Sequence, residues 1–223
     1  YLCSFIITLG IALLLSLQPD IGQTLLVFFS WSVLIFTSGV SIFLLFFLFS
    51  SIILIFFYLI FFVSKFTYIK NRLISFLDSE TGTYNFQSDR ALESITSGGF
   101  FGKGIGEGTL KNRVPEAHTD YIISVISEEF GVIAIILIFL LFLVFTYSVF
   151  KKVDFENDEI IKLILVGSIS LILMQAIIHI GVNIRLFPTT GMTLPFISYG
   201  GSSIISISIL SGIILNFTKR NLN

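Results

Sequence analysis

Long stretches without any charged residue constrain this chain more than any other feature. The uncharged stretches are 1–19, 21–64, 130–150, 163–184 and 186–218. A helix needs about 20 mostly apolar residues to cross a membrane, and each of these stretches reaches or approaches that length. Charged residues make up 12% of the 223 residues, against about 25% in soluble domains. The sequence therefore predicts an all-α, polytopic membrane bundle.

The stretch 21–64 is long enough for two spans, and the polar segment 37–41 supplies a turn at its middle. We expect the whole chain, 1–223, to form one membrane domain with about six spans. The expected spans are about 1–17, 22–38, 42–63, 121–149, 160–180 and 195–217. Because the chain begins with Tyr1 inside an apolar stretch, we expect an N-terminal portion to precede it.

Polar residues concentrate in one long segment, 65–120, which holds 7 of the 13 basic residues. We expect it to be a large extracytoplasmic loop, partly ordered, with a short amphipathic helix over 86–95. Short basic segments tend to stay in the cytoplasm. Those that set the orientation here contain Lys151, Lys152, Lys162, Lys219 and Arg220. Alternation of the spans then places 18–20, 65–120 and 183–201 together on the non-cytoplasmic face.

Charge and cysteine content exclude several classes of function. The net charge is −1, so no nucleic-acid partner is indicated. Cys3 is the only cysteine, which excludes an internal disulfide and a metal site built on thiolates.

The strongest candidate for chemistry is Asp120, which lies with Glu116 and His118 where the polar loop meets an apolar stretch. Ionisable residues at such a boundary are costly and usually functional. Ser124, Ser127 and Glu128 follow Asp120 at helical spacing, so we expect a polar stripe that faces the bundle or a wet cavity. A partly buried carboxylate with a raised pKa can act as a general base. The alternative is that Thr119 or Asp120 only caps the following helix.

Basic residues accompany this carboxylate along the loop and suit a phosphate or pyrophosphate group. They are Arg72, Arg90, Lys103, Lys111 and Arg113. For each of these residues taken alone, the alternative to phosphate binding is that it is an ordinary solvated charge of the loop. The segment Gly102–Gly108 looks like a phosphate-cradling loop, but it lacks the GK[ST] ending, and we interpret it as a tight turn.

A third polar cluster, Asn183–Ser203, carries helix-breaking residues at membrane depth. The breakers are Pro188, Gly191, Pro195, Gly200 and Gly201. Broken backbone is tolerated there where it is buried in protein or lines a cavity. The alternatives are a simple kink for this cluster and a snorkelling role for Arg185. A fourth cluster, Gln18–Asp20, is explained by a polar turn, and His179 by an interhelical hydrogen bond.

Four motifs, in this order, resemble those of the SEDS family (shape, elongation, division and sporulation), which includes FtsW and RodA. They are QPDIG at 18–22, SGGFFGKGIG at 97–106, PEAHTDY at 115–121 with EEFG at 128–131, and GMTLPFISYGGSS at 191–203. The resemblance covers essentially the whole chain. The family has ten spans, which implies that this chain holds the last six.

The resemblance implies a peptidoglycan glycosyltransferase in the bacterial inner membrane, with its active face extracytoplasmic. Its substrate would be lipid II, a disaccharide-pentapeptide on undecaprenyl pyrophosphate, and Asp120 would be the catalytic carboxylate. Substrate-binding residues are expected among Gln18, Asp20, Arg72, Lys111, Arg113, Glu116, His118, Thr119, Arg185, Ser198, Tyr199, Gly200 and Gly201. Expected partners are a class B penicillin-binding protein with transpeptidase activity, the division or elongation machinery, and membrane lipid.

The wording of the motifs resembles FtsW more than RodA, which favours septal synthesis over the alternative of elongation. Division-type relatives often have PTKG where this chain has Pro188–Gly191, so Thr190 replaces a lysine and Arg185 is a candidate to compensate. No pattern in the sequence indicates a definite cofactor. It stays open whether a divalent cation, Mg²⁺ or Mn²⁺, assists the departure of the pyrophosphate, although no pattern of metal ligands in the sequence demands one. Two other functions also stay open, a lipid II flippase and a non-catalytic membrane scaffold for the penicillin-binding protein.

Overall fold

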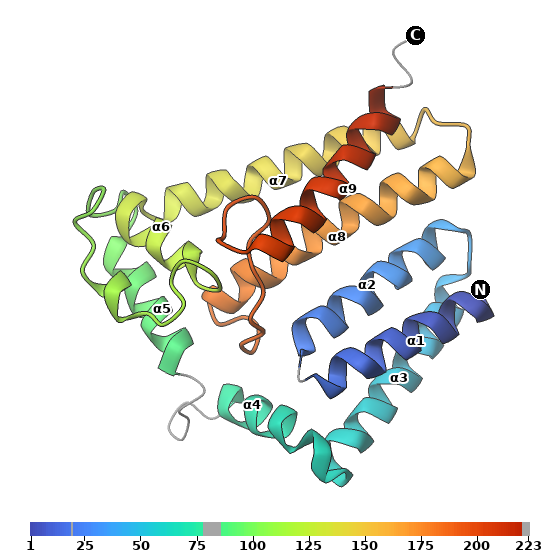
Figure 1. Ribbon diagram of the computed structural model, residues 1–223, viewed down its shortest axis with the longest axis horizontal. Coiled ribbons are helices and arrows are strands. Elements are labelled where there is room, and N and C mark those ends of the chain that lie inside the picture. Colours follow the sequence, from blue (N-terminus) through green and yellow to red (C-terminus); the bar gives the residue numbers. More distant parts are fainter. Residues whose placement is uncertain (19, 78–85, 220–223) are drawn as a thin grey trace.

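The computed structural model describes residues 1–18, 20–77 and 86–219; the side chains of Leu45, Phe56, Leu59, Lys65, Leu77, Lys111 and Asn112 are outside the described set. Within these residues every regular element is helical, as predicted (Figure 1). The helices are α1 (Leu2–Leu17), α2 (Ile21–Thr37), α3 (Ile42–Phe62), α4 (Thr67–Leu77), α5 (Phe86–Gly98), α6 (Ile122–Phe130), α7 (Val132–Val153), α8 (Glu159–Asn183) and α9 (Gly201–Lys219). Two 3₁₀ turns, η1 (Ser64–Phe66) and η2 (Leu110–Arg113), complete the list.

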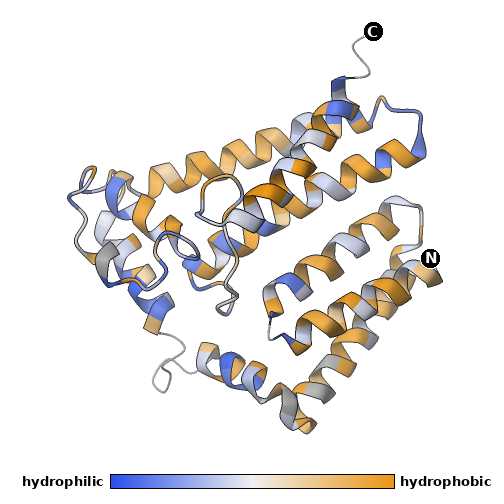
Figure 2. Cartoon of the chain, viewed as in Figure 1, coloured by the Kyte–Doolittle hydropathy of each residue, from blue (hydrophilic) through white to orange (hydrophobic). Residues whose placement is uncertain are grey.

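Six of these helices are apolar and lie at the places where spans were expected. Four of them, α3, α7, α8 and α9, are long and apolar enough to cross a membrane, whereas α1 and α2 are shorter apolar helices of 16 and 17 residues. Hydrophobic residues run along their lengths, and hydrophilic residues gather at their ends and in α4 and α5 (Figure 2). Large apolar side chains point outward, Phe43 being 83% exposed and Phe46 75% exposed. An exposed apolar face of this kind suits contact with lipid.

The expected span 121–149 is wrong as a single helix, because Gly131 divides it into α6 and α7. Gly131 has φ +80°, a conformation that side chains with a Cβ rarely adopt. A Cβ at Gly131 would also clash with the carbonyl oxygen of Phe100, so the glycine allows close approach of two backbone segments. At this close approach the amide of Val132, the first residue of α7, donates to the carbonyl of Gly99 at 2.9 Å.

The expected span 195–217 is also displaced, because α9 begins only at Gly201. Residues 184–200 form no regular helix, and Arg185 and Phe196 have positive φ angles of 58° and 66°. This confirms the predicted break in the backbone and makes the alternative of a simple kink wrong. The segment folds back over the end of the helix bundle instead of crossing it (Figure 1).

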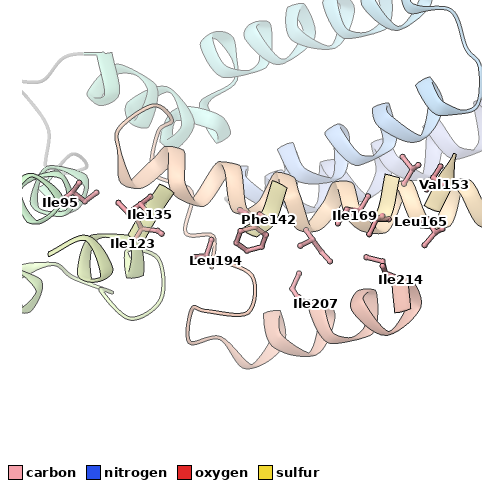
Figure 3. Close-up of a cluster of buried hydrophobic side chains, with 14 residues drawn as sticks. Ile95, Ile123, Ile135, Phe142, Val153, Leu165, Ile169, Leu194, Ile207 and Ile214 are labelled. Atoms are coloured by element: carbon pink, nitrogen blue, oxygen red, sulfur yellow. The ribbon is translucent and has the colours of Figure 1, made fainter. Parts of the chain in front are cut away.

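Helix α8 is the centre of the bundle and packs against α2, α7 and α9. Its Ile169 and Ile172 are fully buried in the main apolar cluster, which Figure 3 shows between α7, α8 and α9. Gly167 lets α2 approach closely, since a Cβ there would come within 3.0 Å of Leu34 Cδ2. Close packing of this kind holds helices together in a membrane, where lipid is as apolar as leucine.

The segments that contain the predicted polar clusters meet at one end of the bundle, and the charged connection between α7 and α8 lies at the other end (Figure 2). The facing ends of α1 and α2, helices α4, α5 and α6, and the 184–200 segment lie at the end with the polar clusters (Figure 1). The predicted helix over 86–95 is confirmed as α5, whereas α4 was not predicted. The bundle therefore brings together residues that are more than 100 positions apart in the sequence.

Candidate functional site

A charged hollow of about 280 Å³ opens at the polar end of the bundle. Its lining comes from the α1–α2 connection, α4, α5, the turn before α6, and the 184–200 segment. The lining residues are Gln18, Asp20, Arg72, Gln87, Asp120, Tyr121, Thr189, Thr190 and Gly191. Four residues predicted for the site, Gln18, Asp20, Arg72 and Asp120, are thus brought to one hollow.

A tight turn, 116–121, carries Asp120 into this hollow. Glu116 has φ +55°, and its carbonyl oxygen accepts from the amides of Thr119, Asp120 and Tyr121 at 3.1, 3.1 and 3.3 Å. Helix α6 begins after this turn with Tyr121 as its N-cap residue and no side-chain capping bond. The alternative that Thr119 or Asp120 caps the helix is therefore wrong. The Thr119 hydroxyl instead donates to a Glu116 carboxylate oxygen at 3.0 Å.

The carboxylate of Asp120 is free of hydrogen bonds and ion pairs in the part of the chain that the structure describes, and its residue is partly exposed. Burial raises the pKa of this carboxyl group above its ordinary value, and the nearby negative charge of Glu116 raises it further. The Asp120 Oδ2 atom lies 3.5 Å from the place where a Cβ of Gly191 would stand. A free carboxylate of raised pKa beside open space is available to accept a proton.

The expected polar stripe does not share a helix face with Asp120, because α6 begins only at Ile122. Ser124, Ser127 and Glu128 are completely buried, and they face α5 and the glycine-rich segment instead of the hollow. The burial of the stripe agrees with the prediction, but its continuity with Asp120 is wrong.

The Glu128 carboxylate binds the glycine-rich segment from within. It accepts from the amides of Thr109 and Leu110, both at 2.9 Å, and from the Ser94 hydroxyl at 3.1 Å. The Lys103 ammonium lies 3.4 Å from the same carboxylate. A Cβ at Gly108 would come within 2.8 Å of the carboxylate carbon, which explains the glycine there.

The amides of the segment 102–108 are used within the protein. Those of Lys103 and Gly104 donate to the carbonyls of Glu128 and Glu129, at 2.9 and 3.0 Å. The amide of Gly106 donates to the Glu129 carboxylate at 3.2 Å. Carboxylates of the protein therefore occupy the place where a bound phosphate would have to lie. This agrees with the interpretation of the segment as a tight turn and not with that of a phosphate-binding loop.

Arg72 is the one basic side chain among the described residues that lines the charged hollow. Its guanidinium donates to the carbonyl of Thr189 at 3.2 Å. The other cations have different partners or places. Arg90 pairs with Glu93 at 2.6 Å, and Arg185 pairs with Asp89 of α5 at 2.6 Å. Arg113 is exposed outside the lining of the hollow, and the Lys111 side chain lies outside the described residues.

The remaining predicted site residues are not part of the lining of the charged hollow. His118 is exposed, and its ring lies 6.1 Å from the ring of Tyr199. Ser198 is buried, and its hydroxyl contacts the backbone of the 116–121 turn. Gly201 is exposed at the start of α9. Gly200 belongs to a second hollow.

This second, uncharged hollow has a volume of about 340 Å³ and lies between α2, α8 and α9. Its polar lining consists of amide and hydroxyl groups from Gln23, Gln175, Thr193, Ser203 and others. Gly191 lines both hollows. The Asp120 carboxylate therefore lies near the place where the charged and the uncharged hollow meet.

Several residues of the site were not predicted as part of it. Asn183 is fully buried and donates its side-chain amide to the Asp120 carbonyl at 3.1 Å. Gln175 donates to the Thr193 carbonyl at 2.9 Å beside the uncharged hollow. Both are polar residues inside an apolar helix, and that was the available signal. Thr189 lies in the predicted cluster Asn183–Ser203 without having been singled out, and Gln87 gave no comparable signal.

Comparisons with known proteins agree with this arrangement. The chain matches the family of FtsW, RodA and SpoVE, described as cell cycle proteins, over residues 1–223. A protein of Caulobacter vibrioides, named "Probable peptidoglycan glycosyltransferase FtsW", is 37% identical over 215 residues, which cover 95% of this chain and 53% of that protein. A protein of the same name from Trichlorobacter lovleyi is 35% identical over 222 residues, or 98% of this chain and 56% of that protein.

A solved structure is similar over the full length of this chain, with a TM-score of 0.81 and 27% sequence identity. It was described under the words "Structural coordination of polymerization and crosslinking by a peptidoglycan synthase complex", and 63% of that chain is covered. The present chain spans about half the length of the curated relatives it matches.

Proposed function

Because the chain belongs to the FtsW/RodA/SpoVE family of cell cycle proteins, we propose that it is the part of a peptidoglycan glycosyltransferase that carries the reacting carboxylate. The substrate is lipid II, and the product is a glycan strand for septal wall synthesis. One observation carries the proposal. The Asp120 carboxylate is free of partners among the described residues, has a raised pKa, and lines a hollow with Arg72.

In the proposed reaction the Asp120 carboxylate accepts the proton of the 4-hydroxyl of the acceptor sugar. The hydroxyl oxygen then bonds to the anomeric carbon of the donor sugar, and the bond from that carbon to the phosphate oxygen breaks. Undecaprenyl pyrophosphate leaves with the bonding electron pair. Arg72 stabilises the negative charge of this leaving group, since a guanidinium binds phosphate oxygens well.

The raised pKa of Asp120 suits this role. A general base works best when its pKa is near the working pH, because it must be ionised and still bind a proton strongly. An ordinary aspartate, with a pKa near 3.9, is a weak base at neutral pH. Burial and the charge of Glu116 move the pKa of Asp120 in the useful direction.

The experiment that tests the proposal is polymerisation of purified lipid II by the full-length protein and its Asp120→Asn variant. Asparagine keeps the size of the side chain and removes the basic oxygen. We expect glycan synthesis to fall by about 10²- to 10⁴-fold, the usual contribution of a general base. Normal synthesis by a folded Asp120→Asn protein would defeat the proposal and favour the scaffold alternative.

The flippase alternative requires polar sites that are reachable from both faces of the membrane. The segments that contain the candidate site residues lie at one end of the bundle instead (Figure 1), which supports a polymerase. Transport of fluorescent lipid II across sealed vesicles, measured with the Asp120→Asn variant, separates the two functions. Transport that needs Asp120 would favour the flippase.

The membrane and its sidedness are part of the proposal: the inner membrane, with the charged hollow outside the cytoplasm. A cysteine at Thr119, in a variant without Cys3, should react with an impermeant maleimide added to spheroplasts. Reaction only after permeabilisation would place the hollow in the cytoplasm.

A class B penicillin-binding protein is the proposed partner, and it would join the new strands by transpeptidation. An elongation role, as in RodA, would appear as rescue of cell shape without rescue of septation.

A Mg²⁺ or Mn²⁺ ion at the charged hollow is a further proposal. The carboxylates of Asp20 and Asp120 line this hollow, and hard cations prefer oxygen ligands. Asp20 already accepts from the Gln23 amide with one oxygen, at 2.9 Å, which leaves its second oxygen available. Loss of synthesis on adding EDTA, restored by either metal, would support the ion.

A further inference from the structure

Three consecutive carbonyl groups of the turn that carries Asp120 are held from the other side of the site. The amide of Tyr199 donates to the His118 carbonyl at 3.0 Å. The hydroxyl of Ser198 donates to the Thr119 carbonyl at 2.7 Å. The side-chain amide of Asn183 donates to the Asp120 carbonyl at 3.1 Å. We call these three donors, Asn183, Ser198 and Tyr199, the carbonyl clamp.

The inner side of the same turn is equally well bonded. The amides of Thr119, Asp120 and Tyr121 converge on the single carbonyl of Glu116. With the carbonyl clamp on the outer side, the backbone on both sides of the Asp120 α-carbon is fixed by hydrogen bonds. Backbone groups with such partners are held in place.

The clamp residues are themselves fixed. Ser198 is 3% exposed, and its hydroxyl accepts from the Leu194 amide at 2.8 Å while it donates to Thr119. Asn183 is fully buried and donates also to the His179 carbonyl at 2.9 Å. Both contacts of its side-chain amide are carbonyls, which settles the orientation of the group. Its oxygen has no partner among the described residues, so the residue serves here as a donor.

The carboxylate of Asp120 contrasts with its backbone, because no side-chain bond from a described residue fixes it. A general base must keep its oxygens free for substrate and still stand in one place. From this contrast, and on the basis of the proposed function, we infer that Ser198 and Asn183 are positioning residues that place the Asp120 carboxylate through the backbone carbonyls of Thr119 and Asp120. The only proton of the Ser198 hydroxyl is then used by the Thr119 carbonyl and is not available to substrate.

Ser198 allows a sharp test, because two substitutions have opposite predictions. Ser198→Thr keeps the hydroxyl and adds a methyl group, whereas Ser198→Ala removes the hydroxyl and adds nothing. If Ser198 acts through its hydrogen bond, kcat of lipid II polymerisation falls about 10- to 100-fold in the alanine variant, as displaced catalytic groups do, while KM is unchanged and threonine restores kcat. If tight packing is what matters, threonine is the more harmful substitution, and the proposal is overturned.

The matched control is Ser211→Ala in α9, which also removes a hydroxyl bonded to a carbonyl, that of Ile207 at 2.7 Å. Ser211 is outside the lining of both hollows, and its substitution should leave kcat unchanged. In the Asp120→Asn background, Ser198→Ala should cause no further loss of turnover, because it acts through Asp120. A further loss of tenfold or more in that background would contradict positioning.

Hydrogen exchange separates failure of this inference from failure of the proposed function. In the full-length protein, Ser198→Ala and Asn183→Leu should each speed amide exchange in a peptide spanning 116–121, while Ser198→Thr and Ser211→Ala should not. This readout needs no catalytic activity. Unchanged exchange in both clamp variants would overturn the clamp even if lipid II is polymerised, and faster exchange in a protein that makes no glycan would sink the proposed function alone.

Discussion

Asp120 and Glu128 lie eight positions apart and are both acidic, yet their surroundings differ completely. Glu128 is fully buried and accepts from two amides and a hydroxyl, with an ammonium group nearby. Asp120 is partly exposed at a hollow, and its carboxylate has no partner among the described residues. Hydrogen-bond donors around a carboxylate stabilise its ionised form, and the carboxylate in turn holds the groups that donate to it. A carboxylate without such partners is available for reaction. The comparison separates an acid that holds the fold from an acid that is free for the proposed reaction.

The largest effect on stability is expected at Glu128. Glu128→Ala removes the acceptor of the Thr109 and Leu110 amides and of the Ser94 hydroxyl, and the ion-pair partner of Lys103. We expect a loss of about 2–4 kcal/mol in the free energy of unfolding, because hydrogen bonds to a charged group contribute about 1.5–3 kcal/mol each and Glu128 accepts several. Thermal unfolding in detergent measures it. Glu93→Ala, at an exposed pair with Arg90, is the control and should cost less than about 1 kcal/mol. Equal losses of unfolding free energy in the Glu128→Ala and Glu93→Ala variants would contradict a structural role for Glu128.

A smaller effect is expected at Arg72, on binding instead of stability. Arg72→Ala removes the described cation that lines the charged hollow and should raise KM for lipid II about tenfold, or about 1.4 kcal/mol. Arg113→Ala is the matched control, because Arg113 is exposed outside that lining. An equal KM in the wild type and the Arg72→Ala variant would contradict this prediction. Arg72 would then serve only to hold the Thr189 carbonyl.

The smallest effect concerns the pH dependence of stability. The folded-state pKa of Asp120 lies above its value in the unfolded chain, so the folded protein binds more protons between the two values. Asp120 therefore makes a contribution to stability that declines as pH rises from near 4 through its folded pKa. The Asp120→Asn variant should lack this decline and be slightly more stable at pH 7, by under about 1 kcal/mol because water reaches the carboxyl group. A variant that is clearly less stable would assign Asp120 a structural role like that of Glu128.

The sequence predicted the six apolar helices and the gathering of polar clusters at one end, because both follow from where charged residues are absent. It also singled out Asp120, since a carboxylate at the mouth of an apolar stretch is costly, and the structure places Asp120 in the lining of the charged hollow. It did not predict that the turn at Glu116 separates Asp120 from Glu128. Helical spacing treats 120–128 as one helix, and only the positive φ of Glu116 and the late start of α6 reveal two environments.

Long-range contacts account for the other differences. Asn183 contacts the Asp120 carbonyl across 63 positions, and no local pattern in the sequence indicates such a bond. The glycines at 98, 102 and 108 were visible as a motif. A phosphate loop and a close backbone crossing both require glycine, however, and only the contacts with α6 decide for the crossing.

The most direct test of the central claim is the pH dependence of single-turnover glycan synthesis by the full-length protein and its Asp120→Asn variant. The wild-type rate should rise with pH along one ionisation, with an apparent pKa above the ordinary aspartate value near 3.9. The residual rate of the variant should lack this rise. The same rise in both proteins would show that another group accepts the proton, and would contradict the account.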